Sequence, residues 1–198
     1  MNALAYFITF HTYGSWLHGR EAGSVDRDHN QYGTEFLPAN SGLEQARRQQ
    51  MIHEPYLLNP ADREIVLASI CQHCEYRKWL LYAAHVRSNH VHVIVASTKS
   101  VEQTMTEFKA YATRSLVAAH PQEAKRKRWS RHGSTRYVFD DKGLEAVVRY
   151  VIEGQGEAMA VYCRPPLPSG RGSEISHRTD NPSRDASDQN RDASAAAP

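Results

Sequence analysis

Two histidines separated by one apolar residue are the first feature of this sequence that could do chemistry. His90 and His92 lie in a run from His90 to Ala96 that is rich in β-branched residues and lacks Gly and Pro, which predicts a strand. Alternate side chains of a strand share a face, so both imidazoles point one way and the valines between and after them point toward a core. Two imidazoles at this spacing can chelate one divalent cation. The simpler alternative is two half-exposed histidines on an edge strand, which is the commoner outcome for an isolated pair.

A tyrosine late in the chain could act as a nucleophile beside such a cation, whereas no Ser or Cys lies in a recognisable nucleophile motif. It lies on a last helix that we expect to begin at Asp140 or Asp141 and to run to about Gly154. At about 100° per residue, Tyr150 lies roughly 130° from the centre of the apolar stripe of this helix, beside small residues. It is therefore not a core residue of its own helix, although a surface tyrosine packed on a loop would give the same pattern. Tyr111 is a second candidate, but packing at the margin of the core explains it more simply.

The expected elements follow the order strand, insertion, helix, strand, strand, helix, strand, helix. By residue number they are a strand over 4–12, a short helix over 43–53 at the end of a long loop, a helix over 63–77 that begins at Asn59-Pro60, strands over 79–86 and 90–96, a helix from Ser100 to 119, a strand over 136–139 and the last helix. This order predicts an α+β fold with a ferredoxin-like, split βαβ antiparallel sheet, helices on one face and the other face open. The histidine pair would lie on the open face, and the C-terminal helix would carry the candidate tyrosine.

The composition is that of an ordinary globular protein, with 198 residues, 40% hydrophobic residues, 23% charged residues and a net charge of +2. We expect one folded domain over residues 1–163, with an insertion at about 18–53. A disordered tail would follow over 164–198, because that stretch has almost no large apolar residue. No apolar run is long enough to span a membrane, and the first residues lack the basic segment of a signal peptide. Three cysteines do not make a disulfide framework, so we expect reduced thiols and a cytoplasmic location.

A basic segment that ends in an indole is the strongest local charge feature. Together with single cations before and after it, this segment could contact the phosphates of single-stranded DNA or of a hairpin stem, while the indole stacks on a base. The predicted DNA-binding residues are Lys109, Lys125, Arg126, Lys127, Arg128, Trp129, Arg131 and Arg136, and Arg114 could extend the set. A solvated basic loop explains the same pattern equally well.

Two motifs taken together resemble those of a known family. Asn89-His90-Val91-His92 after a strand, and Arg149-Tyr150-Val151-Ile152-Glu153 on a late helix, resemble the single-tyrosine HUH transposases of the small insertion sequences and their relatives, the REP-associated tyrosine transposases. The opening Tyr6-Phe7-Ile8-Thr9-Phe10 fits the same family, as do Trp129, Gly133-Ser134 and Tyr137. The resemblance extends from about Leu4 to Gln155, which is most of the part expected to fold.

The resemblance implies a role for each of these residues. His90 and His92 would bind Mg²⁺ or Mn²⁺, which polarises the scissile phosphate of hairpin-bearing single-stranded DNA. Tyr150 would attack that phosphate and form a covalent 5′-phosphotyrosine, leaving a free 3′-OH, so that the protein nicks and rejoins DNA. Members of the family often have a polar metal ligand four residues after the tyrosine, where this sequence has Gly154. Gln155 lies about 100° further round a regular helix, so it can be the third ligand only if the helix loosens at Gly154.

The resemblance also suggests a partner, and two alternatives stay open. Members of the family are often homodimers in which the tyrosine helix acts on the metal site of the partner, so a homodimer is an expectation by analogy. The first alternative is a non-catalytic RNA- or DNA-binding module of the same topology, although such modules stack bases on aromatic residues where this central strand has histidines. The second alternative is a metal-dependent nuclease in which water is the nucleophile and Tyr150 has no chemical role.

Overall fold

The computed structural model of the chain describes residues 3–16 and 41–165. The elements in these ranges are β1 (Ala5–Thr12), α1 (Ser41–Gln49), α2 (Pro60–Arg77), β2 (Leu80–Val86), β3 (His90–Ala96), α3 (Val101–Ala119), the 3₁₀ turn η1 (Pro121–Glu123), β4 (Trp129–Val138), α4 (Asp141–Glu153) and β5 (Ala160–Cys163). Most of the predicted insertion at 18–53 and nearly all of the predicted tail at 164–198 lie outside the described residues. No helix in the described ranges is long and apolar enough to cross a membrane.

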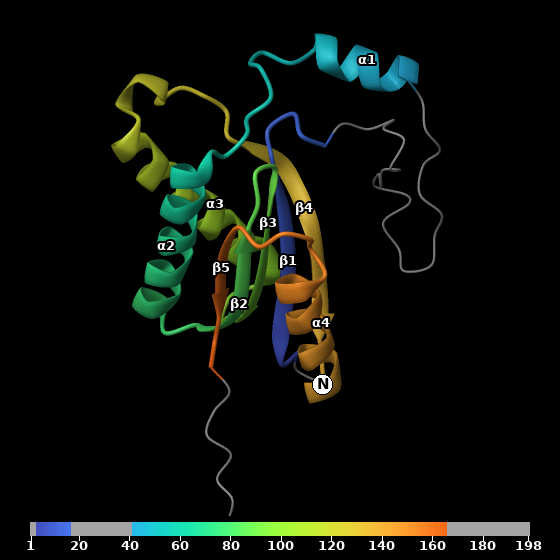
Figure 1. The fold of residues 1–198 in the computed structure, drawn as a ribbon, viewed down its shortest axis with the longest axis vertical. Coiled ribbons are helices and arrows are strands. Elements are labelled where there is room, and N and C mark those ends of the chain that lie inside the picture. Colours follow the sequence, from blue (N-terminus) through green and yellow to red (C-terminus); the bar gives the residue numbers. More distant parts are fainter. Residues whose placement is uncertain (1–2, 17–40, 166–198) are drawn as a thin grey trace, which may run out of the picture. The chain divides into compact units, whose positions relative to one another are not determined.

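The strands of the described ranges form one antiparallel sheet in the order β4-β1-β3-β2-β5, with β3 in the middle (Figure 1). The order of its first four strands and of the helices between them is that of a split βαβ arrangement, which confirms the predicted ferredoxin-like α+β fold. Two strands differ from the sequence prediction, because β4 begins at Trp129 rather than near Arg136 and β5 is an additional strand. Both lie at sheet edges; the first half of β4 has few apolar residues, and β5 is only four residues long, so each gives a weak sequence signal.

Helices α2 and α3 cover one face of the sheet and form the main core with it (Figure 1). The three valines of β3 that were expected to point inward, Val91, Val93 and Val95, are fully buried on this face. They belong to one apolar cluster with residues of both helices, including Val66 of α2 and Phe108 of α3. The alternation predicted for the central strand is therefore confirmed, and the histidine pair lies on the opposite face.

Helix α4 lies on that second face, which the sequence analysis expected to be open. Its apolar stripe buries Val147 and Val151 in a separate cluster with Ala5, Ala83 and Ile94 of the strands. A helix with a continuous apolar stripe is stable only if the stripe is covered, and α2 and α3 already occupy the first face. α4 therefore covers part of the face that carries the histidine pair, and the C-terminal end of α4 lies close to the two histidines.

Side-chain caps fix where the three long helices begin, as the sequence predicted. The Asn59 side chain accepts a hydrogen bond from the amide of Asp62, and Ser100 forms a reciprocal capping box with Gln103. Asp140 caps α4 by accepting a hydrogen bond of 2.6 Å from the amide of Gly143. Each cap satisfies an amide that has no partner within the helix.

Candidate active site

Strand register brings polar residues from three neighbouring strands together around the middle of β3. On one side, Thr9 of β1 pairs with His92, and on the other side His85 of β2 pairs with the same residue. His11 of β1 pairs with His90. All of these side chains lie on the α4 face, because they occupy positions that alternate with the buried valines.

His92 is held by a hydrogen bond at each ring nitrogen. Its Nδ1 lies 2.7 Å from the hydroxyl oxygen of Thr9, and its Nε2 lies 3.1 Å from the amide oxygen of Gln155. The residue is only 6% exposed, and burial together with the neighbouring His90 lowers the pKa of His92 to about 3. The imidazole is therefore neutral at physiological pH, which is the form that binds a metal ion.

One ring nitrogen of His90 is oriented by its sequence neighbour, and the other faces Gln155. Its Nδ1 lies 2.7 Å from the side-chain oxygen of Asn89, which fixes the proton on Nδ1 because that amide oxygen accepts. Burial lowers the pKa of His90, and hydrogen bonding with Gln155 offsets part of this effect. The ring centroids of His90 and His92 are 4.7 Å apart. The arrangement fits the usual pattern of metal-binding histidines, in which an outer oxygen holds the nitrogen that does not bind the metal.

Gln155 reaches the histidines because α4 ends just before it. The last helical residue is Glu153, and Gly154 follows as the C-cap, with its amide 3.0 Å from the carbonyl oxygen of Tyr150. The amide oxygen of Gln155 then contacts His92, as described above, and its amide nitrogen lies 3.4 Å from the same carbonyl. The condition that the sequence analysis set for this residue, a helix that loosens at Gly154, is therefore met.

The donor set of this site suits a divalent cation that leaves positions open for substrate oxygens. Two imidazole nitrogens and one amide oxygen converge, and the residues that would hold Mg²⁺ or Mn²⁺ are His90, His92 and Gln155. Within the described residues, no cluster of three or more His, Cys, Asp or Glu side chains could hold a metal ion. A third ligand from the residues that converge here would be the glutamine, and the remaining positions would be left to water and phosphate.

Tyr150 stands beside the histidine pair although it lies off the apolar stripe of its helix. Its side chain is 50% exposed, and its ring centroid is 6.0 Å from those of both His92 and Phe7. Tyr111 has a different environment, because its ring centroid lies 4.0 Å from that of His73 on the side of the sheet that α2 and α3 cover. Of the two candidate nucleophiles, the structure brings only Tyr150 to the histidines.

The predicted DNA-binding residues divide into exposed and structural groups. Lys125, Lys127, Arg131 and Arg136 are exposed, and Arg126 is half-buried. Arg128 is only 2% exposed, and its guanidinium lies 5.7 Å from the centre of the Tyr56 ring. Among the exposed cations, the Lys127 ammonium lies 5.3 Å from the centre of the Tyr13 ring. The exposed cations can meet a phosphate at the surface, whereas Arg128 would first have to leave its buried position.

Trp129 and Lys109 are used within the fold. The indole nitrogen of Trp129 donates to the carbonyl of Lys109 at 3.1 Å and to the hydroxyl of Thr113 at 2.9 Å, and its ring packs edge-on against Phe10. The Lys109 ammonium donates to carbonyls of residues 130–132, and burial lowers its pKa to about 8. These two residues therefore join α3 to β4, and a stacking or phosphate-binding role would compete with those bonds.

The sequence analysis did not assign Thr9, Asn89 or His85 to the site. A signal for Thr9 exists, since it shares a face of β1 with Phe7 and His11 by simple alternation. Its partner, however, lies 83 residues further along the chain, and only the strand register joins the two. The same holds for His85, which is recognisable only once β2 and β3 are paired.

A comparison with protein families decides the relationship of the chain. The family model described as "Transposase IS200 like" matches residues 50–154, which is just over half of the sequence. The chain belongs to the IS200-like transposase family. The matched range contains His90, His92 and Tyr150, and Gln155 follows it directly. The protein is thus related to enzymes that act on DNA in transposition.

Two solved structures are similar to this member of the IS200-like transposase family at low sequence identity. One is a REP-associated tyrosine transposase bound to a REP hairpin, with 12% identity and a TM-score of 0.42 over 77% of this chain. The chain spans 66% of the length of that structure. The other is a proposed transposase from Deinococcus radiodurans R1, with 11% identity and a TM-score of 0.38 over 76% of this chain and 90% of the other. No curated protein matches the sequence.

Proposed function

We propose that this protein is a metal-dependent endonuclease and transesterase that acts on hairpin-bearing single-stranded DNA through a 5′-phosphotyrosine intermediate. The observation that carries the proposal is the meeting of Tyr150, His90, His92 and Gln155 within one chain. The family supplies the class of reaction, and a tyrosine beside a candidate metal site is what a covalent version of that reaction requires. We also propose that the protein acts in the cytoplasm.

Few residues of the chain would take part in the strand-cleavage step, and each would have its own role. The phenol oxygen of Tyr150 attacks the scissile phosphorus, so that an O–P bond forms while the bond to the 3′ oxygen breaks. The phenol loses its proton, and the leaving 3′ oxygen gains one. A bound Mg²⁺ or Mn²⁺ supplies Lewis-acid polarisation of the phosphate. Asn89 orients the His90 imidazole from its Nδ1 side, and Thr9 holds Nδ1 of His92. To bind the ion, His92 would exchange the contact of its Nε2 with Gln155 for the metal and shift its proton to Nδ1, where the Thr9 hydroxyl oxygen can accept it.

Rejoining would use the same atoms in reverse. A 3′-OH of the same or another strand attacks the phosphotyrosine and restores a phosphodiester, and the phenol takes back a proton. No nucleotide cofactor is required, since the covalent link keeps the energy of the broken bond.

Exposed cations on β4 and on the loop before it would guide the DNA. Arg136 pairs in register with Phe7, whose ring contacts Tyr150, so a strand that reaches the tyrosine passes this guanidinium. Lys125 and Lys127 lie on the loop before β4 and could hold the stem of a hairpin. A homodimer remains a prediction of the resemblance.

The decisive experiment is a denaturing gel that detects a covalent protein–DNA adduct. Hairpin-bearing single strands labelled at the 5′ or the 3′ end are incubated with wild type, Tyr150→Phe and Tyr111→Phe, in Mn²⁺ or in EDTA. The strands come from repeats that flank the gene, with a REP hairpin as a further substrate. We expect an adduct that requires Mn²⁺, retains the label on the 3′ side of the break and is lost only in Tyr150→Phe.

Each other outcome contradicts a particular part of the proposal. Loss of the adduct only in Tyr111→Phe would show that the nucleophile is Tyr111 of α3 and not Tyr150. Metal-dependent cleavage without an adduct would indicate a nuclease that uses water. Binding of the hairpins with neither cleavage nor adduct would indicate a non-catalytic nucleic-acid-binding protein.

A further inference from the structure

His85 is a buried imidazole beside the candidate site that the proposed chemistry does not use. It lies opposite His92 in the register of β2 and β3, and it is fully buried. Its Nδ1 lies 2.9 Å from the carbonyl oxygen of Val151, and its Nε2 lies 3.2 Å from the amide nitrogen of Met159. A carbonyl only accepts and an amide only donates, so the ring is the neutral tautomer with its proton on Nδ1. Burial, which lowers the pKa of His85, favours the same neutral form.

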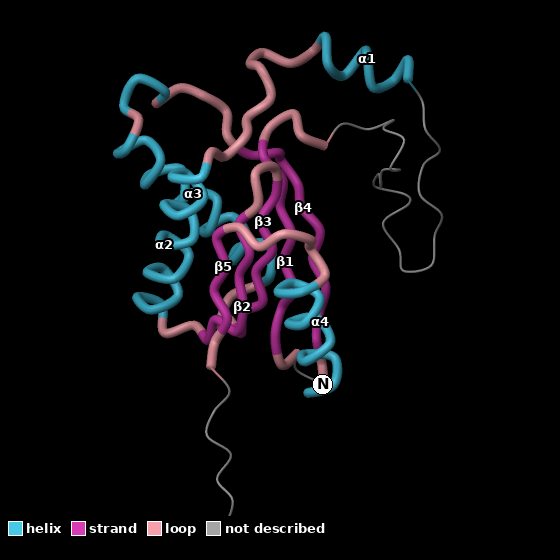
Figure 2. Tube along the Cα trace, in the orientation of Figure 1, coloured by secondary structure: helices cyan, strands magenta, loops and turns pink. Residues whose placement is uncertain are grey.

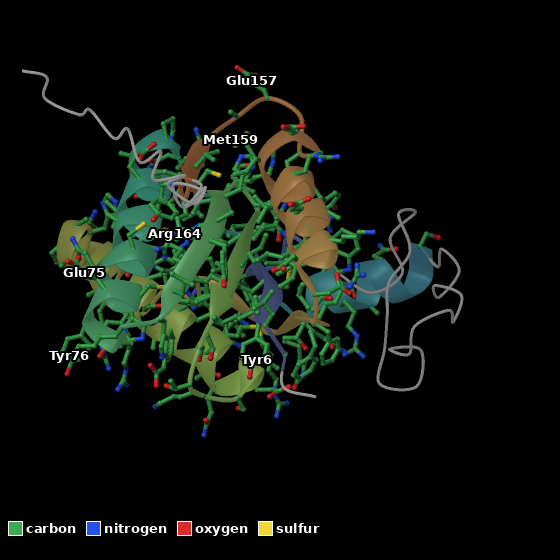
Figure 3. All side chains as sticks on the ribbon, turned by 90° about the horizontal axis from the view of Figure 1, so that it is seen from below. Tyr6, Glu75, Tyr76, Glu157, Met159 and Arg164 are labelled. Carbon is green, nitrogen blue, oxygen red and sulfur yellow. The ribbon has the colours of Figure 1, made fainter. Side chains whose placement is uncertain are left out.

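These two contacts bracket the segment that carries Gln155. Val151 lies in the last turn of α4, directly after the tyrosine, and Met159 lies four residues beyond Gln155. The loop between them receives one more hydrogen bond, of 3.0 Å, from the Arg87 guanidinium to the carbonyl of Glu157. Figure 2 shows this loop in pink, crossing between α4 and β5, and Figure 3 labels Glu157 and Met159 on it. One imidazole of the sheet thus joins both ends of the segment.

We propose that His85 is a positioning residue that sets Tyr150 and Gln155 over the histidine pair. Otherwise α4 is held on the sheet mainly by its apolar stripe, and apolar packing is non-directional. The bond to Val151 fixes the last turn of the helix, and the bond to Met159 fixes the chain after Gln155. The catalytic consequence of this inference rests on the proposed function, whereas the ordering of residues 151–159 does not.

A histidine that merely fills the core would behave differently, and His73 provides the matched control. His73 is also buried, with Nε2 2.8 Å from a carboxylate oxygen of Glu107, but it lies on α2 at the opposite face. Loss of either imidazole lowers the free energy of unfolding, because each removes a buried hydrogen bond, although Glu107 keeps its bonds from Arg77 and Lys99. Only loss of the His85 imidazole is expected to release the segment at Gln155.

The first test is hydrogen–deuterium exchange on the full-length protein, which requires neither metal nor DNA. His85→Asn retains a donor near the position of Nδ1, and His85→Gln retains an acceptor near the position of Nε2, so the two variants separate the two bonds. We expect faster exchange at the Met159 amide in His85→Asn and faster exchange in the last turn of α4 in His85→Gln. His73→Gln should leave both segments unchanged. Unchanged exchange over 151–159 in both His85 variants would overturn the proposal, whatever the activity.

The second test is the rate of adduct formation in a single turnover at saturating DNA. Both His85 variants should react on the order of 10–100-fold more slowly than wild type and need more Mn²⁺ for half of their maximal rate, with little change in DNA affinity. Folded His73→Gln should keep the wild-type rate. Faster exchange with an unchanged rate would reject the catalytic role of His85. Failure of wild type to form any adduct would instead reject the proposed function, and the exchange result would still decide whether His85 orders the segment.

Discussion

Gly154 is the residue at which α4 has to end so that Gln155 can face the histidines. Its φ of −83° is accessible to any residue, so the constraint is space rather than backbone conformation. A Cβ atom at this position would lie 2.8 Å from the carbonyl oxygen of Tyr150 and 3.1 Å from Cδ2 of its ring. Neither distance fits a normal contact, so a larger residue would displace the tyrosine or the chain that follows it.

We therefore expect Gly154→Ala to slow adduct formation by about tenfold or more without weakening DNA binding. Single-turnover kinetics at saturating DNA measures this rate, and binding is measured separately. Gly143→Ala in the first turn of the same helix is the control, since the nearest atom to its added Cβ would be 3.2 Å away, at the carboxylate of Asp140. An equal loss of rate in both variants would show that the stability of α4, and not the position of the tyrosine ring, determines the effect.

The individual site residues differ in how far the sequence could predict them. His90, His92 and Tyr150 follow from local patterns, namely alternation in a strand and distance from an apolar stripe, and these patterns need no knowledge of the rest of the fold. The contact of Gln155 with His92 depends on the exact residue at which α4 ends. Helix propensity predicts the end of a helix only to within a residue or two, so the sequence does not predict this contact. Thr9 depends on pairing between distant strands. The binding of Mg²⁺ or Mn²⁺ by the site stays a prediction.

At the scale of elements, an irregularity in β4 explains the position of Lys109. The pairing of β1 with β4 shifts register between Phe10 and Thr12, so residues 130–132 face a single residue of β1. The Lys109 ammonium lies 3.0, 3.4 and 3.2 Å from the carbonyl oxygens of residues 130, 131 and 132. A bulge leaves backbone groups without a strand partner, and here one lysine of α3 supplies the missing donor.

Lys109→Met should consequently lower the free energy of unfolding by about 0.5–1.5 kcal/mol, because the carbonyls of residues 130–132 lose their shared donor. The exposed Lys125 is the comparison. Lys125→Met should leave stability unchanged, weaken DNA binding and reduce the slope of log affinity against log salt by about one. Urea denaturation and fluorescence anisotropy over a range of salt measure the two effects. If the Lys109 variant has wild-type stability and a reduced salt slope, Lys109 contacts DNA and does not have the structural role described here.

The elements themselves were predictable where the sequence marks them strongly. The N-cap residues Asn59, Ser100 and Asp140 predict where three helices start, and the run of valines predicts β3. No comparable sign marks β5 or the first half of β4, since β5 is only four residues long and the first half of β4 has few apolar residues. Both are stabilised by pairing with the sheet. The side on which α4 packs was not predictable either, because an apolar stripe indicates that a helix is covered but not by which face.

At the scale of the whole molecule, one chain contains both the candidate nucleophile and the candidate metal ligands. We expect that a mixture of Tyr150→Phe and His92→Ala forms no more adduct than either variant alone, since each chain then lacks one half of its own site. The measurement is the same denaturing gel after joint refolding of the two variants, with wild type mixed into each as the control for inhibition. Adduct restored in the mixture would establish action between the subunits of a dimer, as the resemblance suggests.

The tyrosine helix connects the two outermost strands of the sheet. The helix begins just after β4 at one edge of the sheet, and the loop after the helix leads into β5 at the other edge. The chain is therefore anchored to the sheet by a paired strand before α4 and by another after it. To carry the tyrosine away from the histidines, the protein would have to break the packing of α4 on the sheet and the bond from His85 to Val151. If the adduct forms, the captured DNA end therefore stays beside the histidines for as long as α4 stays packed on the sheet. A second end would have to travel to it, and the order in which DNA segments arrive would decide between resealing the original strand and joining it to a new one.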